Sequence, residues 1–227
     1  MTAHAASRWS DLRLRILSAC VLAPLGLAGL WLGGTAWLAL IAVLAVGLGS
    51  EWFLLCRKLA RGQPGWSQLA AVLAGVPYIG LATAALLWLR AGDGVGRRAV
   101  LFVMLVVWAS DIGAYLVGRL LGGPLLAPAI SPGKTWSGAA GGLLAAALVG
   151  FATLHPAAAL LASGLGIAAQ LGDLMESAMK RGFGVKDSGW IIPGHGGLLD
   201  RLDGLLTAAP AAAAVSLFAG RAAVGWG

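Results

Sequence analysis

The chain of 227 residues is 59% hydrophobic and only 11% charged, and it contains 35 glycines. This composition excludes an ordinary soluble globular domain, where about a quarter of the residues are charged. The net charge of +7 does not indicate a nucleic-acid partner, because the basic residues are dispersed between apolar segments. We therefore predict a polytopic membrane protein whose small residues allow close helix packing.

Seven apolar segments are long enough to cross the roughly 30 Å of hydrocarbon in a bilayer. They lie at about residues 16–32, 36–55, 69–89, 99–121, 139–154, from 157 into a polar stretch, and 205–219. The fold class is therefore all-α, with about seven transmembrane helices. Basic residues before the first segment resemble a secretory signal, but a second apolar segment follows almost immediately, so we interpret the first as a retained anchor.

The distribution of basic residues predicts that the N-terminus and the polar stretch lie on the cytoplasmic side. Arg90, Arg97 and Arg98 are exceptions, because the loop after the third segment would lie on the opposite side of the membrane. Gly75 and Pro77 interrupt that segment. A re-entrant segment or two half-helices is therefore an alternative to one continuous span.

Charge is concentrated between Asp173 and Asp203, a stretch that holds nine of the 25 charged residues and five of the nine acidic ones. Asp173, Glu176, Ser177 and Lys180 are spaced i, i+3, i+4 and i+7, so they share one helix face. A polar cleft lined by these side chains is one interpretation. A simple surface pair of Glu176 with Lys180 is the other.

A second acidic cluster, Asp200 and Asp203, follows the Gly-rich residues 193–197. Glycines around His195 would let backbone amides approach an anionic ligand. Five cationic or imidazole groups accompany the carboxylates: Lys180, Arg181, Lys186, His195 and Arg201. Carboxylates that hold a divalent metal, beside cations that bind phosphate, predict phosphoryl or nucleotidyl transfer at the membrane surface.

Asp111 interrupts the fourth apolar segment, and an ionised carboxylate facing lipid would be costly. Tyr115 and Arg119 follow at i+4 and i+8 and so share its helix face. We predict an intramembrane polar site at Asp111 and Tyr115. A structural interhelical hydrogen bond or an Asp–Arg pair is the alternative.

The next loop contains Gly133, Lys134 and Thr135, which resemble the end of a P-loop. Pro128 stands where the first glycine of that motif belongs, so a P-loop is excluded. We interpret this tripeptide as a flexible helix start whose amides and ammonium hold a phosphate. A lysine that only sets topology is the alternative.

The polar stretch resembles the signature of the phosphatidate cytidylyltransferases, also called CDP-diacylglycerol synthases. Its motifs are Ser177-x-x-Lys180-Arg181-x4-Lys186-Asp187-x-Gly189, Ile192-Pro193-Gly194-His195-Gly196-Gly197 and Asp200-Arg201-x-Asp203. Ser110-Asp111-x-x-Ala114-Tyr115-x-x-Gly118 and Ser131-Pro132-x-Lys134-Thr135 also resemble this family, and Glu51-Trp52 does so more loosely. The resemblance covers about residues 108–204. Many members are longer in the N-terminal half, so the number of helices there stays open.

The resemblance implies the reaction of CTP with phosphatidate to give CDP-diacylglycerol and pyrophosphate, with Mg²⁺ as the cofactor. Whether a second cation binds beside Mg²⁺ stays open. It implies an integral enzyme of the bacterial cytoplasmic membrane, with its active site facing the cytoplasm and no nucleic-acid partner. We treat the chain as a single membrane-embedded domain, with N-terminal helices over residues 1–98 and catalytic helices and loops over residues 99–227. A homodimer is expected only from the general frequency of such assemblies.

By motif position, the resemblance implies Asp173 and Asp200 as metal ligands, with Asp203 supporting them and Lys180 as a further catalytic residue. The substrate-binding or phosphate-binding residues that it implies are Lys134, Thr135, Ser177, Arg181, Lys186, His195 and Arg201.

Two other classes of membrane protein are alternatives. CDP-alcohol phosphotransferases need Asp-Gly-x-x-Ala-Arg, but residues 203–208 read Asp-Gly-Leu-Leu-Thr-Ala, so this class is excluded. An ion carrier with Asp111 as its intramembrane site is the second alternative, but the sequence shows no inverted repeat of the kind found in many carriers. It would also leave the clustered Lys, Arg and His residues unexplained.

Overall fold

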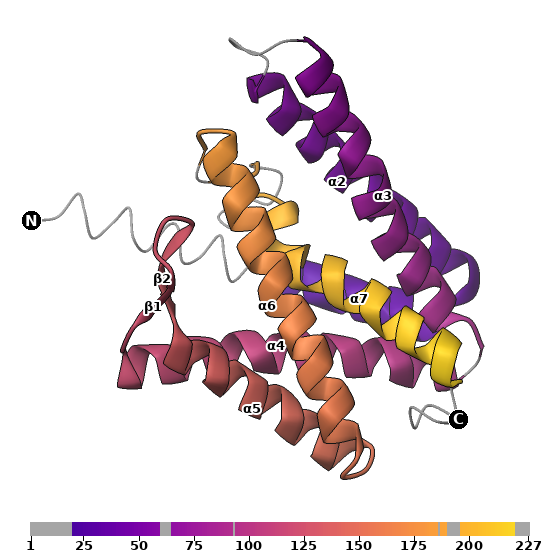
Figure 1. Ribbon diagram of the computed structural model, residues 1–227. Helices are drawn as coiled ribbons and strands as arrows, with labels where there is room; N and C mark the ends of the chain where they lie inside the picture. The colour runs from indigo at the N-terminus through magenta and orange to yellow at the C-terminus, as the bar shows by residue number, and fades with distance from the viewer. Residues whose placement is uncertain (1–19, 60–64, 93, 186, 190–195, 221–227) are drawn as a thin grey trace, which may run out of the picture.

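The computed structural model describes residues 20–59, 65–92, 94–185, 187–189 and 196–220. Figure 1 shows a bundle of crossing helices with one small hairpin at its edge. The elements are α2 (Gly34–Leu59), α3 (Gly65–Arg90), α4 (Val95–Leu121), β1 (Leu125–Ala127), β2 (Ser131–Thr135), α5 (Trp136–Thr153), α6 (Ala158–Gly182) and α7 (Leu199–Ala219).

Six helices in the described ranges, α2 to α7, are long and apolar enough to cross a membrane. A shorter apolar helix, Cys20–Leu32, represents the described part of the first predicted segment. The predicted all-α polytopic membrane fold is confirmed, and the predicted and observed segments agree to within a few residues at most ends.

The β1–β2 hairpin was not predicted. Its antiparallel strands pair Leu125 with Thr135 and Ala127 with Ser131. The hairpin joins α4 to α5 and projects from their shared end, as Figure 1 shows. Lys134 therefore lies on a strand rather than in a flexible loop.

Helices α4 and α5 lie side by side because small residues remove the side chains that would separate them. A Cβ atom at Gly113 would lie 2.7 Å from the carbonyl oxygen of Gly141, and one at Gly138 would lie 2.8 Å from that of Ala114. The predicted role of small residues in close helix packing is confirmed at this pair.

Buried apolar side chains form two clusters. The first surrounds α4 and includes Leu89, Val100, Val103, Val106, Leu165 and Ala209. The second lies between α2, α3 and α7 and includes Leu48, Leu55, Ile79, Leu199 and Leu206. Helix α7 contributes to both clusters and therefore ties the N-terminal helices to the remainder of the bundle.

The alternative of a broken third segment is wrong, because α3 is one continuous helix that contains Pro77. Pro77 lies on the exposed face of the helix, and the glycine near it serves packing. A Cβ atom at Gly75 would lie 2.7 Å from Cε2 of Trp52, whose indole N–H donates to the carbonyl of Ala71 at 2.9 Å. The glycine admits an aromatic ring from α2 instead of breaking the helix.

The structure also explains the position of Arg90, one of the exceptions to the predicted distribution of basic residues. Its side chain is buried, and its Nε donates to the carbonyl oxygen of Leu30 at 2.7 Å, near the C-terminal end of the helix Cys20–Leu32. Carbonyls in the last turn of a helix lack intrahelical donors, so a guanidinium satisfies one of them. Arg97 lies over the ring of Trp31, with 5.5 Å from Cζ to the ring centroid. These arginines hold the N-terminal helix against the bundle.

Helix α7 begins at Leu199, earlier than the predicted start at residue 205. Asp200 and Asp203 consequently lie in its first turns and not in the preceding loop. Acidic side chains are favourable at a helix N-terminus, and hydropathy alone does not detect that preference.

The close contact of α4 with α5 predicts different outcomes for two glycine substitutions. Gly113→Ala should lower the free energy of unfolding by about 1–3 kcal/mol, because its new methyl group would meet backbone of α5. Thermal unfolding of the purified protein in detergent measures the change.

Gly164→Ala is the matched control, since no atom lies within 4 Å of a Cβ at that position in α6. It should be neutral or stabilise the helix by up to about 1 kcal/mol. Equal effects of the two substitutions would contradict this account of the packing.

Candidate active site

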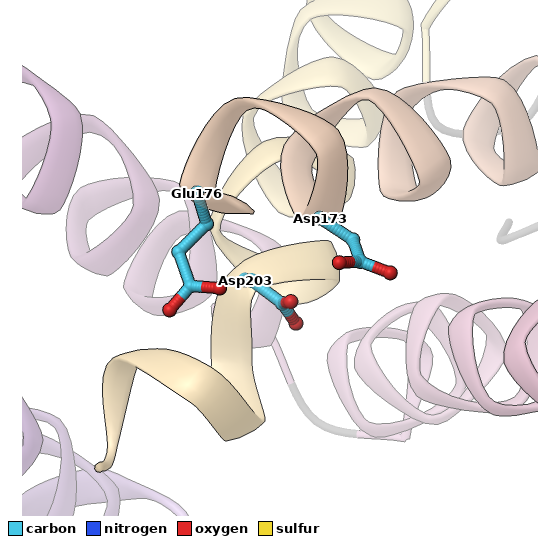
Figure 2. Close-up of side chains that lie close together, drawn as sticks. All are labelled: Asp173, Glu176 and Asp203. Atoms are coloured by element: carbon cyan, nitrogen blue, oxygen red, sulfur yellow. The ribbon is translucent and has the colours of Figure 1, made fainter. Parts of the chain in front are cut away.

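Three carboxylates meet where α6 passes the first turns of α7. One oxygen each of Asp173, Glu176 and Asp203 lies within 4.8 Å of the other two. Figure 2 shows the three side chains in the space beside these two helices. The i, i+3 spacing places Asp173 and Glu176 on one face of α6, as predicted. We refer to these three side chains as the carboxylate cluster.

A close approach of the two helices builds the cluster. A Cβ atom at Gly172 would lie 2.6 Å from the carbonyl oxygen of Asp203, so only glycine allows this separation. The hydroxyl of Thr207 donates to the carbonyl of Ala168 at 2.7 Å and joins the same two helices. The backbone contact therefore fixes Asp173 next to Asp203.

Glu176 is the most buried member of the carboxylate cluster, with 3% of its surface exposed. Its Oε2 lies 2.8 Å from the ammonium of Lys180, but its Oε1 is buried and has no hydrogen-bond partner among the described residues. A buried carboxylate oxygen without a partner is costly. A cation beside Oε1 would satisfy it.

Lys180 joins this cluster to Asp200. Its Nζ lies 2.7 Å from Asp200 Oδ1 as well as 2.8 Å from Glu176 Oε2. The other oxygen of Asp200, Oδ2, accepts the N–H and the hydroxyl of Ser188 at 3.0 and 2.9 Å and the N–H of Gly197 at 2.9 Å. Asp200 therefore has a donor for both oxygens, and it is not a member of the carboxylate cluster.

A cavity of about 480 Å³ adjoins the cluster on the side of α4 and the hairpin. Its polar lining includes Asp111, Tyr115, Arg119, Lys134, Thr135, Gln170 and Asp173. Lys134 Nζ lies 2.5 Å from Asp173 Oδ2, so Asp173 belongs both to the cluster and to the cavity wall. Two cationic and two carboxylate side chains line this space, which suits a polyanionic ligand bound together with a metal.

The polar stripe predicted on the fourth segment faces this cavity. Arg119 Nη1 donates to the hydroxyl of Tyr115 at 2.9 Å, and Asp111 lines the cavity on the same helix face. Gln170 of α6 donates to the hydroxyl of Ser110 at 3.2 Å and to the carbonyl of Ala139 at 3.1 Å. In the described residues the ion pair of Asp111 with Arg119, one of the alternatives, does not form.

Thr135 caps the start of α5, since its hydroxyl accepts the N–H of Gly138 at 3.0 Å. This contact confirms that the Gly-Lys-Thr segment precedes a helix. One amide at this helix start, that of Gly138, therefore already has an acceptor within the protein.

Residues 64–219 match the cytidylyltransferase family. The chain belongs to this family. The family membership that the motifs predicted is therefore confirmed.

Relatives of this cytidylyltransferase-family chain include bacterial proteins named phosphatidate cytidylyltransferase. The protein from Brucella suis is 45% identical over 177 residues, which are 75% of this chain and 61% of that protein. The protein from Rickettsia bellii is 38% identical over 218 residues, with coverage of 88% and 89%. The protein from Staphylococcus epidermidis is 42% identical over 160 residues, with coverage of 67% and 60%. The chain spans about three fifths of the Brucella and Staphylococcus relatives.

Three further predicted site residues of this cytidylyltransferase-family chain are described, two on α6 and one on α7. Ser177 donates to Asp173 Oδ1 at 3.5 Å, and Arg181 Nε donates to the carbonyl of Ile130 in the hairpin at 3.2 Å. Arg201 is exposed on the first turn of α7. Lys186 and His195 lie outside the described residues.

Glu176 was predicted on the same helix face as Asp173, but it was not among the predicted metal ligands. Its spacing from Asp173 was the available signal. Sequence reasoning also assigned no role to Ser188, Gln170 or Glu51. Of these three residues, Glu51 had a signal in the sequence, because Glu51-Trp52 loosely resembles a motif of the family.

The two ion pairs of Lys180 predict a large loss of stability in Lys180→Met. The side chains of Glu176 and Asp200 are only 4% and 12% exposed, so the variant leaves two buried carboxylates without their cation. We expect the free energy of unfolding to fall by about 3–5 kcal/mol, measured by thermal or denaturant unfolding in detergent.

Arg119→Met provides the control, since this exposed arginine contacts an exposed tyrosine hydroxyl. Its effect should stay within about 1 kcal/mol. Adding Glu176→Gln to Lys180→Met should restore part of the lost stability, and a further large loss in the double variant would contradict the assignment.

Proposed function

We propose that this chain is a phosphatidate cytidylyltransferase, which transfers CMP from CTP to phosphatidate and releases pyrophosphate. The single observation that carries the proposal is the carboxylate cluster of Asp173, Glu176 and Asp203 beside a cavity lined by Lys134 and Arg119. Membership in the cytidylyltransferase family and the names of its relatives supply the nucleotide and the lipid substrate.

The donor set of the carboxylate cluster fits Mg²⁺, which prefers carboxylate oxygens and retains water ligands. The unpartnered Glu176 Oε1 is the specific feature that supports this fit. Among the described residues, the printed ion pairs join Asp173 to Lys134 and join both Glu176 and Asp200 to Lys180, so three carboxylates share two ammonium groups. A bound metal would compensate this excess of negative charge and draw charge from substrate phosphates.

In this proposal Asp200 orients Lys180 rather than holding the metal. The resemblance of the motifs assigned Asp200 a ligand role, but both of its oxygens already accept hydrogen bonds. Asp203, on the same helix, takes the position beside Asp173. The two aspartates of the last motif thus have different roles.

The reaction forms a bond between a phosphate oxygen of phosphatidate and the α-phosphorus of CTP, and it breaks the bond to the bridging oxygen of the β-phosphate. The attacking phosphate is already ionised, so the chain needs to supply little general-base help. Lys134, on the cavity wall, is placed to bind a substrate phosphate and hold it in line. Positioning and charge neutralisation supply most of the rate.

The membrane arrangement suits substrates from two phases. The carboxylate cluster and the cavity lie where the C-terminal part of α6, the start of α7 and the hairpin meet. The side chains of the proposed site therefore lie near one end of the spanning helices. Phosphatidate would enter from the bilayer and CTP from the cytoplasm. We therefore propose that this end of the bundle faces the cytoplasm.

Purified protein in detergent should convert labelled CTP and phosphatidate to CDP-diacylglycerol with Mg²⁺, and EDTA should abolish the conversion. Asp173→Asn and Asp203→Asn should each lower kcat/KM about 100-fold or more, because each removes a carboxylate from the cluster. Thin-layer separation of the labelled lipid measures the product.

Thr153→Ala serves as the control and should retain wild-type turnover, because Thr153 lies at the end of α5 that is remote from the cavity. Full turnover in both aspartate variants would show that the cluster is not the site. If no lipid nucleotide formed with any divalent metal, ion uptake into vesicles would become the function to test.

A further inference from the structure

Helix α7 begins without a cap of its own. Its N-cap position is Leu198, which has no polar side-chain atom, and no side-chain cap hydrogen bond forms from that position. The first amides of a helix lack intrahelical acceptors, and Ser, Thr, Asp or Asn normally satisfies one of them. The start of α7 also lies among membrane-spanning helices, so its amides need acceptors from elsewhere in the chain.

Glu51 of α2 supplies those acceptors. Its Oε1 accepts the N–H of Leu198 at 2.8 Å, and its Oε2 accepts the N–H of Leu199 at 2.9 Å. Its side chain is buried, with 1% of the residue exposed. The residue that caps α7 therefore comes from a helix that lies 147 positions earlier in the chain.

The same carboxylate reaches the network around Asp200. The hydroxyl of Ser188 lies 3.4 Å from Glu51 Oε2 and 2.9 Å from Asp200 Oδ2, so it can donate its single proton to either carboxylate. Asp200 in turn binds Lys180, and Lys180 binds Glu176 of the carboxylate cluster. Glu51 is thus connected to the site both through the backbone of α7 and through side chains.

Two glycines of the polar stretch make room for Glu51. A Cβ atom at Gly189 would lie 2.5 Å from Glu51 Oε1, and one at Gly197 would lie 2.8 Å from Glu51 Oε2. Distances below about 3 Å require one of the groups to move. These glycines therefore allow the backbone on both sides of residues 190–196 to approach one carboxylate.

We propose that Glu51 is a positioning residue of the active site: by capping α7 it sets the positions of Asp200 and Asp203 against α6. Its effect on turnover rests on the proposed function. Glu51 lies outside residues 64–219, which match the cytidylyltransferase family, so the N-terminal helices contribute to the site. A carboxylate that merely held α2 in the bundle would affect stability alone.

Glu51→Gln tests this proposal in the 227-residue protein in lipid nanodiscs. Glutamine keeps the side-chain size but replaces one acceptor oxygen with an NH₂ group, so one of the two amides loses its acceptor. Hydrogen exchange at the peptide containing Leu198 and Leu199 should become about tenfold faster or more. Displacement of Asp200 and Asp203 should lower kcat by about 10- to 100-fold at a temperature well below unfolding.

Trp52→Phe is the matched control. Trp52 is the next residue of α2, is also buried, and loses its hydrogen bond to the carbonyl of Ala71 in this variant. It should lower the unfolding temperature while leaving kcat and exchange at the start of α7 within about twofold of wild type. This difference separates a positioning role from general support of α2.

A second pair of variants tests the contact if Glu51→Gln does not fold. Gly189→Ala should displace the Glu51 carboxylate and accelerate exchange at Leu198 and Leu199. In the Glu51→Asp background the shorter side chain leaves room for the methyl group, so Gly189→Ala should cause little additional change. Additive effects of the two substitutions would contradict the contact.

Unchanged exchange at Leu198 and Leu199 in Glu51→Gln would overturn the proposal, and so would faster exchange with kcat equal to that of Trp52→Phe. Absence of cytidylyltransferase activity in the wild-type protein would instead defeat the proposed function. The exchange measurement would still decide whether Glu51 holds the start of α7.

Discussion

Carboxylates buried between apolar helices have to be compensated, and the architecture of this site follows from that constraint. Glu51, Glu176 and Asp200 each have a specific partner: the amides of α7, the ammonium of Lys180, or both an amide and an ammonium. Glu176 Oε1 is the exception among them, because it is buried without a described partner. The unmet requirement at this oxygen is the main support for our proposal that the carboxylate cluster binds a cation.

Much of the fold could be predicted from hydropathy, because each spanning helix needs a long apolar segment whatever its neighbours are. Hydropathy does not predict features that depend on a contact with a distant part of the chain. Gly75 and Pro77 resemble a break, yet α3 continues because Gly75 accommodates the ring of Trp52. The hairpin was missed because the three residues of β1 are too few to show an alternating pattern.

The site was predictable where spacing along one helix carries the information. Asp173, Glu176 and Lys180 share a face of α6 because of their i, i+3 and i+7 positions. Sequence cannot tell whether the oxygens of a carboxylate are already occupied, so Asp173 and Asp200 looked equivalent. Nor could sequence assign the cap of α7, since the acceptor lies on α2 and the local residues, Gly197 and Leu198, provide none.

A structure of the protein with bound Mn²⁺, located by its anomalous scattering, tests the central claim most directly. The account predicts an ion about 2.1 Å from oxygens of Asp173, Glu176 and Asp203, with the ion pair of Lys180 and Asp200 intact. An ion that is held by Asp200 after displacement of Lys180, with Glu176 Oε1 still unpartnered, would contradict it.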